Sequence, residues 1–511
     1  MKLNAKLGQP IRMLAMLAGV GMIAWLLRFN AIPPLTFFLG LAVLGVAIFP
    51  MAKWLRERHT LLPMFELICL SLGVHMGLGA IIQPNFIAIH SELHQLDWKF
   101  IDQALLLSLF GVTSMVVVFR LASIWWRRAV PMAIDLRIKP QRRMALVLVL
   151  LATGFAGKAA LFVGWVPVGQ ISSLLNGLIL VAAVIQAIFY YRYPDNRGVS
   201  KWLLFSVVIY LTLMGLETGM LELAVIPLLL VFIVRLGCLR VLPVGVTLLA
   251  LTLLLILNSV KDDYRERVWF GGEGGTTTDK FKIWGEVAAG TNLAKFFSET
   301  EAVEGRGWRE SMSRFSLVNR FAWVCSNTPD HIPFFLGESY LPFIYTPIPR
   351  FLWAGKPIIS DAIDLLDLTY DLKDQGSSAS IGIGFIAEAY ANFSWYGVIF
   401  VMAAQGLFLA FLDRVFNRTS SEGGATIFAV ILSLILNGIG TSAVVIYGNM
   451  PAFFVIFILM FFPFCMRLIE PDAHVGAQRS GNGRGGRRLP AATRYPSNSI
   501  PMPGRGRERI V

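Results

Sequence analysis

Apolar stretches of about twenty residues recur along most of this chain and decide which environment it can fold in. They lie at residues 11–27, 31–50, 61–83, 103–122, 144–164, 171–190, 202–217, 219–235, 241–259, 394–412, 425–447 and 450–468. A helix that spans a bilayer needs about 20 consecutive apolar residues. Charged residues make up only 15% of the chain, whereas about 25% is usual for a soluble domain. The sequence therefore predicts an all-α integral membrane protein with about twelve transmembrane helices.

Lysine and arginine are concentrated in alternate connections between these stretches, such as residues 51–59, 123–143 and 191–201. With the N-terminus, these connections hold about 19 basic residues, against about two in the connections between them. Basic loops stay on the cytoplasmic side of a membrane. We therefore expect cytoplasmic termini and an outward-facing segment at residues 260–390. The net charge of +13 follows from this topology signal, and no nucleic-acid partner is predicted.

The same pattern divides the chain into four regions. Residues 1–259 hold nine predicted transmembrane helices, residues 260–390 form one large outward loop, and residues 391–470 hold three more helices. Residues 471–511 are rich in Gly, Arg and Pro, a composition that cannot bury a core. We expect a disordered basic tail that acts as a topology anchor or touches anionic lipids. The two short runs on either side of Thr218 are expected to form a tight hairpin that does not reach fully through the membrane.

The first part of the outward loop contains two arginine-bearing segments. Arg265 lies in Lys261–Trp269 and either anchors the membrane interface with its aromatic neighbours or contacts a substrate directly. Residues 271–280 are rich in Gly and Thr but lack P-loop spacing, so they are interpreted as a flexible linker. From Trp308 to Asn327, apolar residues recur at helical spacing beside a polar stripe that includes Arg320. This pattern predicts an amphipathic helix on the outer membrane surface.

The second part of the loop, Ile332–Pro357, is nearly as apolar as a membrane span but is interrupted by repeated prolines. Proline removes an amide donor and blocks a regular helix, so we expect no transmembrane helix here. Arg350 and Lys356 end this part, with Trp353 between them. An arginine fork and a lysine point charge suit a pyrophosphate. The alternative is a membrane-surface anchor made of basic and aromatic residues.

Glu388 lies just before the tenth apolar run. A carboxylate at this depth requires a partner or a cavity. It either pairs with an arginine of the loop or accepts a proton from a sugar hydroxyl as a general base. No carboxylate cluster has metal-ligand spacing, and the four cysteines form no CxxC pair. We therefore expect chemistry that needs neither a metal nor a cofactor.

Five motifs follow one another in the loop. They are Lys261–Arg265, the arginines Arg314 and Arg320 before Thr328-Pro329, the Gly-x-x-Tyr of Gly337 and Tyr340, the Pro-Arg-x-x-Trp-x-x-Lys-Pro of Pro349 to Pro357, and the Glu-x-Tyr-x-Asn-Phe of Glu388 to Phe393. In this order they resemble the Wzy-type oligosaccharide repeat-unit polymerases, the O-antigen and exopolysaccharide polymerases. Ala354-Gly355 replaces a Pro-Asp that is common in that family, and Ser394 replaces a frequent glycine.

The resemblance implies a glycosyltransferase of the bacterial inner membrane, with the helical membrane fold of GT-C-type lipid-dependent glycosyltransferases. Such an enzyme transfers a growing glycan from undecaprenyl pyrophosphate to the non-reducing end of a new lipid-linked repeat unit. Its implied partners are the undecaprenyl-pyrophosphate-linked oligosaccharide, membrane lipids, a flippase and a chain-length regulator.

The resemblance and the chemistry of the residues together predict a role for each candidate. Arg350 and Lys356 neutralise the leaving pyrophosphate, where charge develops in the transition state, and Glu388 acts on the acceptor hydroxyl. Substrate-binding residues are expected at Arg265, Arg314, Arg320, Tyr340, Trp353, Tyr390 and Asn392. Three alternatives remain open: an O-antigen ligase of the same chemistry, a flippase or other transporter, and a non-catalytic subunit of an export assembly.

Overall fold

The structure is a computed structural model that describes residues 32–56, 60–82, 85–89, 92–129, 140–163, 170–193, 197–241, 244–290, 316–345, 353, 355–357, 360–373, 381–417, 424–427, 429 and 431. The chain divides into two compact units, Met1–Phe461 and Phe462–Val511. Every described residue belongs to the first unit.

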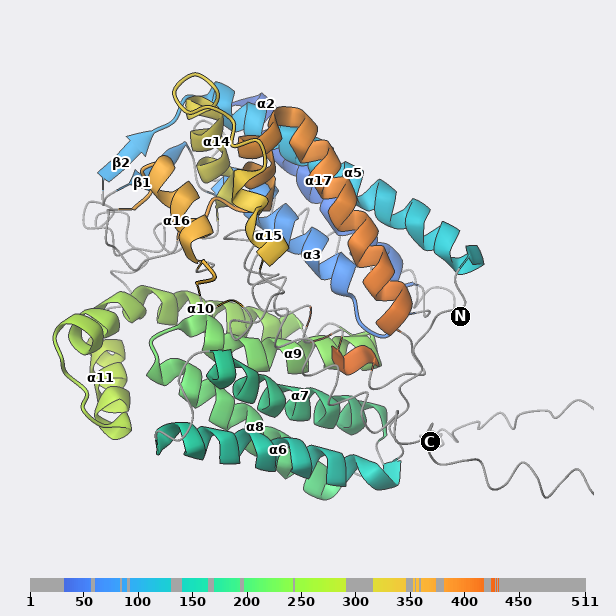
Figure 1. Cartoon of the computed structure of the whole chain (residues 1–511), viewed down its shortest axis with the longest axis vertical. Coiled ribbons are helices and arrows are strands. Elements are labelled where there is room, and N and C mark those ends of the chain that lie inside the picture. Colours follow the sequence, from blue (N-terminus) through green and yellow to red (C-terminus); the bar gives the residue numbers. More distant parts are fainter. Residues whose placement is uncertain are drawn as a thin grey trace, which may run out of the picture. The chain divides into compact units, whose positions relative to one another are not determined.

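Most of the described chain is helical (Figure 1). The first are α2 (Pro34–Trp54), α3 (Met64–Leu72), the π-helix η1 (Gly73–Leu78), α4 (Gly79–Ile82), α5 (Trp98–Ala129), α6 (Pro140–Phe162), α7 (Gln170–Arg192), α8 (Arg197–Glu217) and α9 (Leu221–Leu239). They are followed by α10 (Val244–Arg265), the π-helix η3 (Glu266–Phe270), α11 (Thr277–Gly290), α14 (Leu317–Asn327), the short 3₁₀-helix η5 (Glu338–Tyr340), α15 (Pro342–Tyr345), α16 (Ser360–Thr369) and α17 (Phe385–Phe416). The predicted helical class is confirmed.

One short hairpin departs from the all-α prediction. Strands β1 (Phe86–Ile89) and β2 (Glu92–Gln95) pair antiparallel, with Phe86 opposite Gln95 and Ile89 opposite Glu92. Ile87 and Ile89 are buried and Phe86 is exposed. This is the alternation expected of a strand with one face against protein.

Six helical segments of the described chain are long and apolar enough to cross a membrane. They are Pro34–Trp54, Met64–Ile82, Trp98–Trp126, Arg143–Ala160, Leu221–Leu239 and Phe385–Phe416. The membrane prediction is therefore supported by both length and composition.

The predicted number of about twelve spans is too high for the part of the chain that the structure describes. The predicted runs 11–27 and 450–468, and most of 425–447, lie outside the described residues. Helices α7, α8 and α10 form where spans were predicted but are not among the six. Within α7, the described apolar part is Gly177–Arg192, which is shorter than a span.

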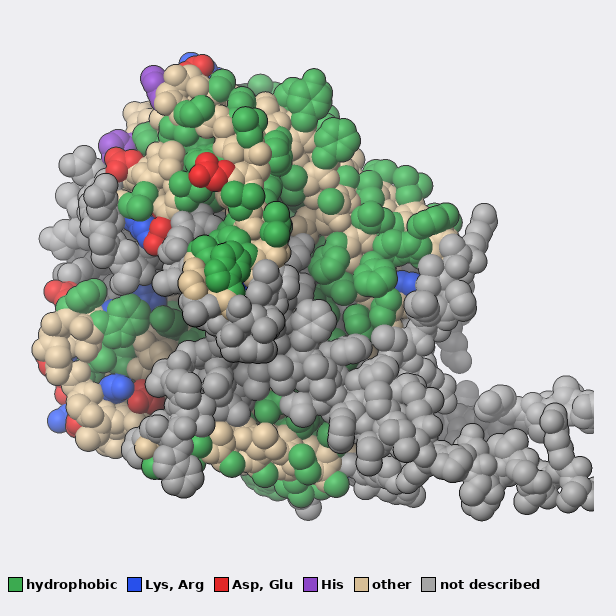
Figure 2. Space-filling model, in the orientation of Figure 1, with side chains coloured by type: hydrophobic (Ala, Val, Ile, Leu, Met, Phe, Trp, Pro, Cys, Tyr) green, Lys and Arg blue, Asp and Glu red, His purple; other side chains and the backbone are tan. Residues whose placement is uncertain are grey.

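Helices α5 and α17 pack closely along their length (Figure 1). A Cβ atom at Gly111 would lie 2.9 Å from Val398 Cγ1, and one at Gly406 would collide with the carbonyl oxygen of Met115. Small residues allow such close approach in membrane helices. The outer faces of α5 and α17 expose large apolar side chains, and Figure 2 shows them gathered over both helices. These faces suit contact with lipid.

The hairpin predicted around Thr218 is confirmed, but the expectation that it does not reach through the membrane is wrong for its second helix, since Leu221–Leu239 is long and apolar enough to cross. Helix α8 ends at Glu217 and α9 begins at Leu221, with Gly219 between them at a φ of 73°. Gly215 lies so close to the backbone of Ala224 that a Cβ atom there would collide with it.

Helix α14 differs from the predicted amphipathic helix. The helix lies against α5 and α17, and its apolar residues are buried inside the protein. The apolar strip at Val318, Phe321 and Val324 is buried. The expectation that this helix lies on the membrane surface is therefore wrong for residues 317–327, while residues 308–315 lie outside the described chain.

Candidate functional site

The helix that carries Glu388 is short because α17 is interrupted. Phe393 and Ser394 have non-helical backbone angles. Residues 385–392 therefore form a separate helix of about two turns before the long apolar helix continues. Every residue of the short helix is buried, so protein encloses the Glu388 carboxylate. The break coincides with residue 394, where the tenth span was predicted to begin.

The loop after α14 caps the end of this short helix. The backbone N–H groups of Phe335 and Leu336 donate to the carbonyl oxygens of Ala391 and Asn392, at 3.0 and 3.1 Å. The last carbonyl groups of a helix have no hydrogen-bond partners within the helix. These two bonds give such partners to the carbonyl groups of Ala391 and Asn392. The loop is thereby fixed just before Gly337, which adopts a φ of 100°.

The motif at Gly337–Tyr340 contacts Glu388 directly. Ser339 Oγ donates to Glu388 Oε1 at 2.9 Å, across 49 positions of sequence. Asn392 Nδ2 donates at 2.8 Å to both Ser339 Oγ and the carbonyl oxygen of Glu388. Asn392 Oδ1 accepts the Gly337 N–H at 2.9 Å. Ser339, Glu388 and Asn392 are fully buried, so these bonds lock two of the predicted motifs together inside the protein.

Two side chains fix the approach to the short helix. Arg320 Nη1 donates to the carbonyl oxygens of Ile381 and Gly382 at 2.7 and 2.9 Å. Asp367 accepts the N–H groups of the same two residues at 2.9 and 2.8 Å. Burial raises the pKa of the Asp367 carboxyl, and the two amide bonds and the nearby charges of Lys373 and Arg320 oppose that rise. Arg320 therefore has a structural role, and its contact with pyrophosphate stays a prediction.

Tyr390 contributes to a second polar network, around Thr328. Its hydroxyl donates to the Thr328 carbonyl oxygen at 3.2 Å and accepts from Gln103 Nε2 at 3.4 Å. The Thr328 hydroxyl lies 2.7 Å from that of Tyr370. Burial raises the pKa of Tyr370 to about 12, so this group stays neutral at physiological pH. The stacking of Tyr390 on a sugar ring stays a prediction.

The basic residues of the Pro-Arg-x-x-Trp-x-x-Lys-Pro motif are only partly described. Arg350, like Arg314, lies outside the described residues. Lys356 is buried, and its backbone N–H donates to the Trp353 carbonyl oxygen at 3.1 Å. The Trp353 side chain is 41% exposed and meets Tyr345 edge to face at 6.2 Å between ring centroids.

An aromatic group lies beside the Gly337–Tyr340 motif. The Tyr340 ring stacks on Phe343 at 5.4 Å and lies 6.2 Å from Phe393, measured between ring centroids. Phe393 is at the break of α17 and is 39% exposed. The group therefore joins the enclosed Glu388 region to an accessible aromatic surface.

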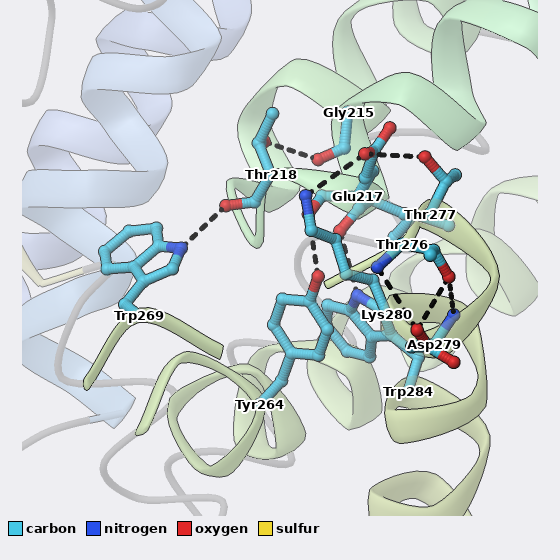
Figure 3. A network of polar contacts seen from close by, with 11 residues as sticks. Gly215, Glu217, Thr218, Tyr264, Trp269, Thr276, Thr277, Asp279, Lys280 and Trp284 are labelled. Atoms are coloured by element: carbon cyan, nitrogen blue, oxygen red, sulfur yellow. Dashed lines mark hydrogen bonds and ion pairs between the residues drawn. The ribbon is translucent and has the colours of Figure 1, made fainter. Parts of the chain in front are cut away.

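Arg265 belongs to a cap at the end of α8, and Figure 3 shows three other members of this cap, Tyr264, Trp269 and Trp284. Four successive carbonyl oxygens, those of Leu216 to Gly219, each accept one side-chain hydrogen bond. The donors are Trp284 Nε1 at 2.8 Å, the Tyr264 hydroxyl at 2.7 Å, Trp269 Nε1 at 3.2 Å and Arg265 Nε at 3.0 Å. The guanidinium carbon of Arg265 also lies 4.7 Å from the centroid of the Trp269 ring. A structural role for Arg265 follows, while pyrophosphate binding by it remains a prediction.

Helix α11 begins inside the segment that was interpreted as a flexible linker. The Thr276 hydroxyl donates to Asp279 Oδ2 at 2.7 Å and accepts the Asp279 N–H at 3.2 Å, an arrangement of the capping-box type. The bonds that the hydroxyl and the backbone N–H of Thr276 donate to the Asp279 carboxylate lower its pKa. Lys280 and Glu217 form an ion pair at 3.2 Å, seen in Figure 3. The linker interpretation is wrong from Thr277 onward, and the Thr-x-x-Asp spacing was the signal that it overlooked.

One known family matches most of the chain. A family model described as "Domain of unknown function (DUF8712)" matches residues 98–465, more than half of the sequence. The chain belongs to this family. No curated protein and no solved structure shows significant similarity to it.

The DUF8712 region begins at α5 and contains every candidate residue predicted from the sequence. It also contains Ser339, Asp367 and Gln103, which the sequence analysis did not single out. Ser339 lies inside the quoted Gly-x-x-Tyr motif, where a small hydroxyl in an apolar stretch was the available signal. Asp367 and Gln103 have no local signal, because their partners are distant in sequence. Among the described residues of the DUF8712 protein, no group of three or more His, Cys, Asp or Glu side chains is placed to hold a metal ion.

Proposed function

We propose that this protein polymerises lipid-linked oligosaccharide repeat units into O-antigen or exopolysaccharide at the outer face of the bacterial inner membrane. It transfers a growing glycan from undecaprenyl pyrophosphate onto the non-reducing end of a new lipid-linked repeat unit. In this proposal residues 260–390 are periplasmic, both termini are cytoplasmic, and the helices follow the GT-C-type arrangement. A flippase supplies the repeat units and a chain-length regulator sets the length of the product.

The hydrogen bond from Ser339 to Glu388 is the observation that carries the proposal. It joins the Gly-x-x-Tyr motif to the Glu-x-Tyr-x-Asn-Phe motif, which the resemblance to repeat-unit polymerases relates only by their order. The carboxylate is enclosed in protein, an environment typical of carboxylates that act as acids or bases. Phe393, in the Glu-x-Tyr-x-Asn-Phe motif, and Trp353, in the Pro-Arg-x-x-Trp-x-x-Lys-Pro motif, have accessible aromatic rings that offer flat surfaces for sugars.

The proposed reaction is a direct glycosyl transfer. The acceptor hydroxyl gives its proton to Glu388 while its oxygen bonds to the anomeric carbon of the donor glycan. The bond from that carbon to the pyrophosphate oxygen breaks, and its electron pair stays on the pyrophosphate. Arg350 and Lys356, with Arg314, neutralise this charge as it develops. The proton then passes from Glu388 to water or to the departing pyrophosphate, which restores the carboxylate.

The proposal is tested in a deletion strain by separating surface polysaccharide on a gel. The strain is complemented with wild type, Glu388→Gln, Arg350→Ala or Glu273→Gln, and the protein in the membrane is measured in parallel. Glu273 is an exposed carboxylate paired with Arg267, so Glu273→Gln is the matched control. We expect a full ladder from wild type and from Glu273→Gln, and single repeat units from the other two.

Each alternative function has its own result in the same experiment. Lipid-linked polymer that accumulates without reaching its acceptor would identify a ligase. Repeat units trapped on the cytoplasmic side would identify a flippase. A normal ladder from both Glu388→Gln and Arg350→Ala would remove the catalytic assignment and leave the loop as an anchor or a binding surface.

A further inference from the structure

Asn392 sets the direction of a short chain of hydrogen bonds that ends on Glu388. Its Oδ1 accepts the backbone N–H of Gly337, a group that can only donate. Its Nδ2 donates to the backbone carbonyl oxygen of Glu388, a group that can only accept. Because both backbone partners have fixed roles, they determine which side-chain atom of Asn392 is nitrogen and which is oxygen.

The direction of the remaining bonds follows from this assignment. The other hydrogen of Asn392 Nδ2 points at Ser339 Oγ, 2.8 Å away, so the serine oxygen accepts. The single hydroxyl proton of Ser339 is then donated to Glu388 Oε1 at 2.9 Å. All three residues are fully buried, so water does not compete for these bonds. Successive bonds in such a chain polarise one another and strengthen the last one.

We infer that Ser339 is a positioning residue, which holds Oε1 of Glu388 and so orients the carboxylate that receives the acceptor proton. The inference rests on the proposed function for the role of Glu388 as a base. The hydroxyl proton of Ser339 lies on one carboxylate oxygen, Oε1, and so limits rotation of the Glu388 carboxylate. Both N–H groups of Asn392 are used in this chain, so the structure assigns Asn392 to the support of Ser339 rather than to sugar binding.

Steady-state kinetics with the purified full-length protein and a lipid-linked repeat unit test the role of Ser339. We expect Ser339→Ala to lower kcat about tenfold while KM stays nearly constant, because a misoriented base weakens the transition state and not substrate binding. Ser339→Thr keeps the hydroxyl and is expected to recover most of kcat. The matched control is Ser326→Ala, which removes a hydroxyl bonded only within α14.

Ser339→Ala is also measured in a Glu388→Gln background. This separates an effect on the orientation of the Glu388 carboxylate from a general effect of the substitution on the fold. Without a base to orient, Ser339→Ala is expected to cause no further loss of kcat. An equal loss in both backgrounds, or a rise in KM at constant kcat, would overturn the inference.

A thermal unfolding cycle tests the contact without relying on activity. The four proteins are wild type, Ser339→Ala, Glu388→Gln and the double variant. Hydrogen bonds to a carboxylate are about twice as strong as neutral ones, so the shift caused by Ser339→Ala is expected to be about half as large in the Glu388→Gln background. Additive shifts would overturn the contact. If wild type forms no polymer but the shifts couple, the proposed function fails and the Ser339–Glu388 arrangement stands.

Discussion

Arg320 and Asp367 hold the same two residues of backbone, Ile381 and Gly382. The arginine donates to both carbonyl oxygens and the aspartate accepts from both N–H groups. These four backbone groups lie directly before the short helix that carries Glu388. The two side chains come from α14 and α16, so distant parts of the loop converge on one dipeptide. Substitution of Arg320 or Asp367 is therefore expected to shift the backbone before the short helix, and with it the position of Glu388.

The first prediction concerns Asp367→Asn. Burial raises the pKa of Asp367 above its ordinary value of 3.8, so the folded state binds the proton more tightly than the unfolded chain. The stabilisation from this carboxyl is then complete at pH values below about 3.8 and is lost as pH rises from there through the raised folded-state pKa. In Asp367→Asn this loss with rising pH is expected to disappear. One backbone N–H also loses its acceptor, which lowers the free energy of unfolding by about 1–3 kcal/mol.

The measurement is the unfolding temperature of the detergent-solubilised protein across the acidic range. Asp97→Asn is the matched control because the Lys99 backbone N–H lowers the pKa of Asp97. Stability from Asp97 is present above its ordinary pKa and lost as pH falls, so this variant changes the pH dependence in the opposite sense. Identical pH profiles for wild type and Asp367→Asn would contradict the prediction.

The second prediction concerns Gly337→Ala. Gly337 has a φ of 100°, and a Cβ atom there would lie 3.2 Å from Phe393 Cζ. Left-handed backbone strains any residue with a Cβ atom, so we expect a loss of about 1–3 kcal/mol in the free energy of unfolding. Activity falls with it, because the Gly337 N–H orients Asn392. Gly275→Ala, at a glycine with open space around it, is expected to be nearly neutral; equal unfolding temperatures for the two variants would refute the argument.

Local sequence patterns predicted the positions of the helices in this fold better than the partners against which the helices pack. Two boundaries follow from short-range signals. The hairpin at Thr218 lies where one polar residue separates two apolar runs, and the long apolar part of α17 begins near residue 394, where an apolar run was predicted to begin. The apolar strip of α14 was also recognised. Its partner was not, because lipid tails and a protein core are both apolar and the sequence pattern is the same for each.

The contacts of the candidate site depend on tertiary structure and have weaker sequence signals. Glu388 was identified because a carboxylate at the edge of a membrane span is unusual. The interlocking of Ser339 and Asn392 could not be derived, since 53 positions separate them. Arg320 and Arg265 were expected to face phosphate because they are basic and lie in the outward loop. No local pattern shows that backbone carbonyl groups already accept their hydrogen bonds.

The third prediction concerns Arg265→Lys. Lysine keeps the charge but loses the Nε donor to the Gly219 carbonyl oxygen and the flat contact with Trp269. We expect the free energy of unfolding to fall by about 1–2 kcal/mol, with kcat per folded molecule unchanged. Unfolding temperature and kcat are measured on the same preparation. Arg267→Lys, at an exposed arginine with surface ion pairs, is expected to change both less. A large loss of kcat at constant stability would instead support the pyrophosphate role of Arg265.

The last prediction concerns Ser394→Gly at the break of α17. Ser394 has a φ of 59° and a ψ of −154°, close to a region of backbone that only glycine occupies readily. Many repeat-unit polymerases, the family that the loop motifs resemble, have glycine after the Asn-Phe pair. Glycine relieves a strain of about 1–3 kcal/mol and adds about 0.5–1 kcal/mol of backbone entropy to the unfolded chain. The net expectation is a rise of about 1 kcal/mol in the free energy of unfolding, measured as a higher unfolding temperature.

Ser206→Gly, in the interior of helix α8, makes the same chemical change where the backbone is helical, and it is expected to lower the unfolding temperature. If both substitutions lower it, the break is not strained by Ser394, and the short helix owes its end to the hydrogen bonds from Phe335 and Leu336 alone.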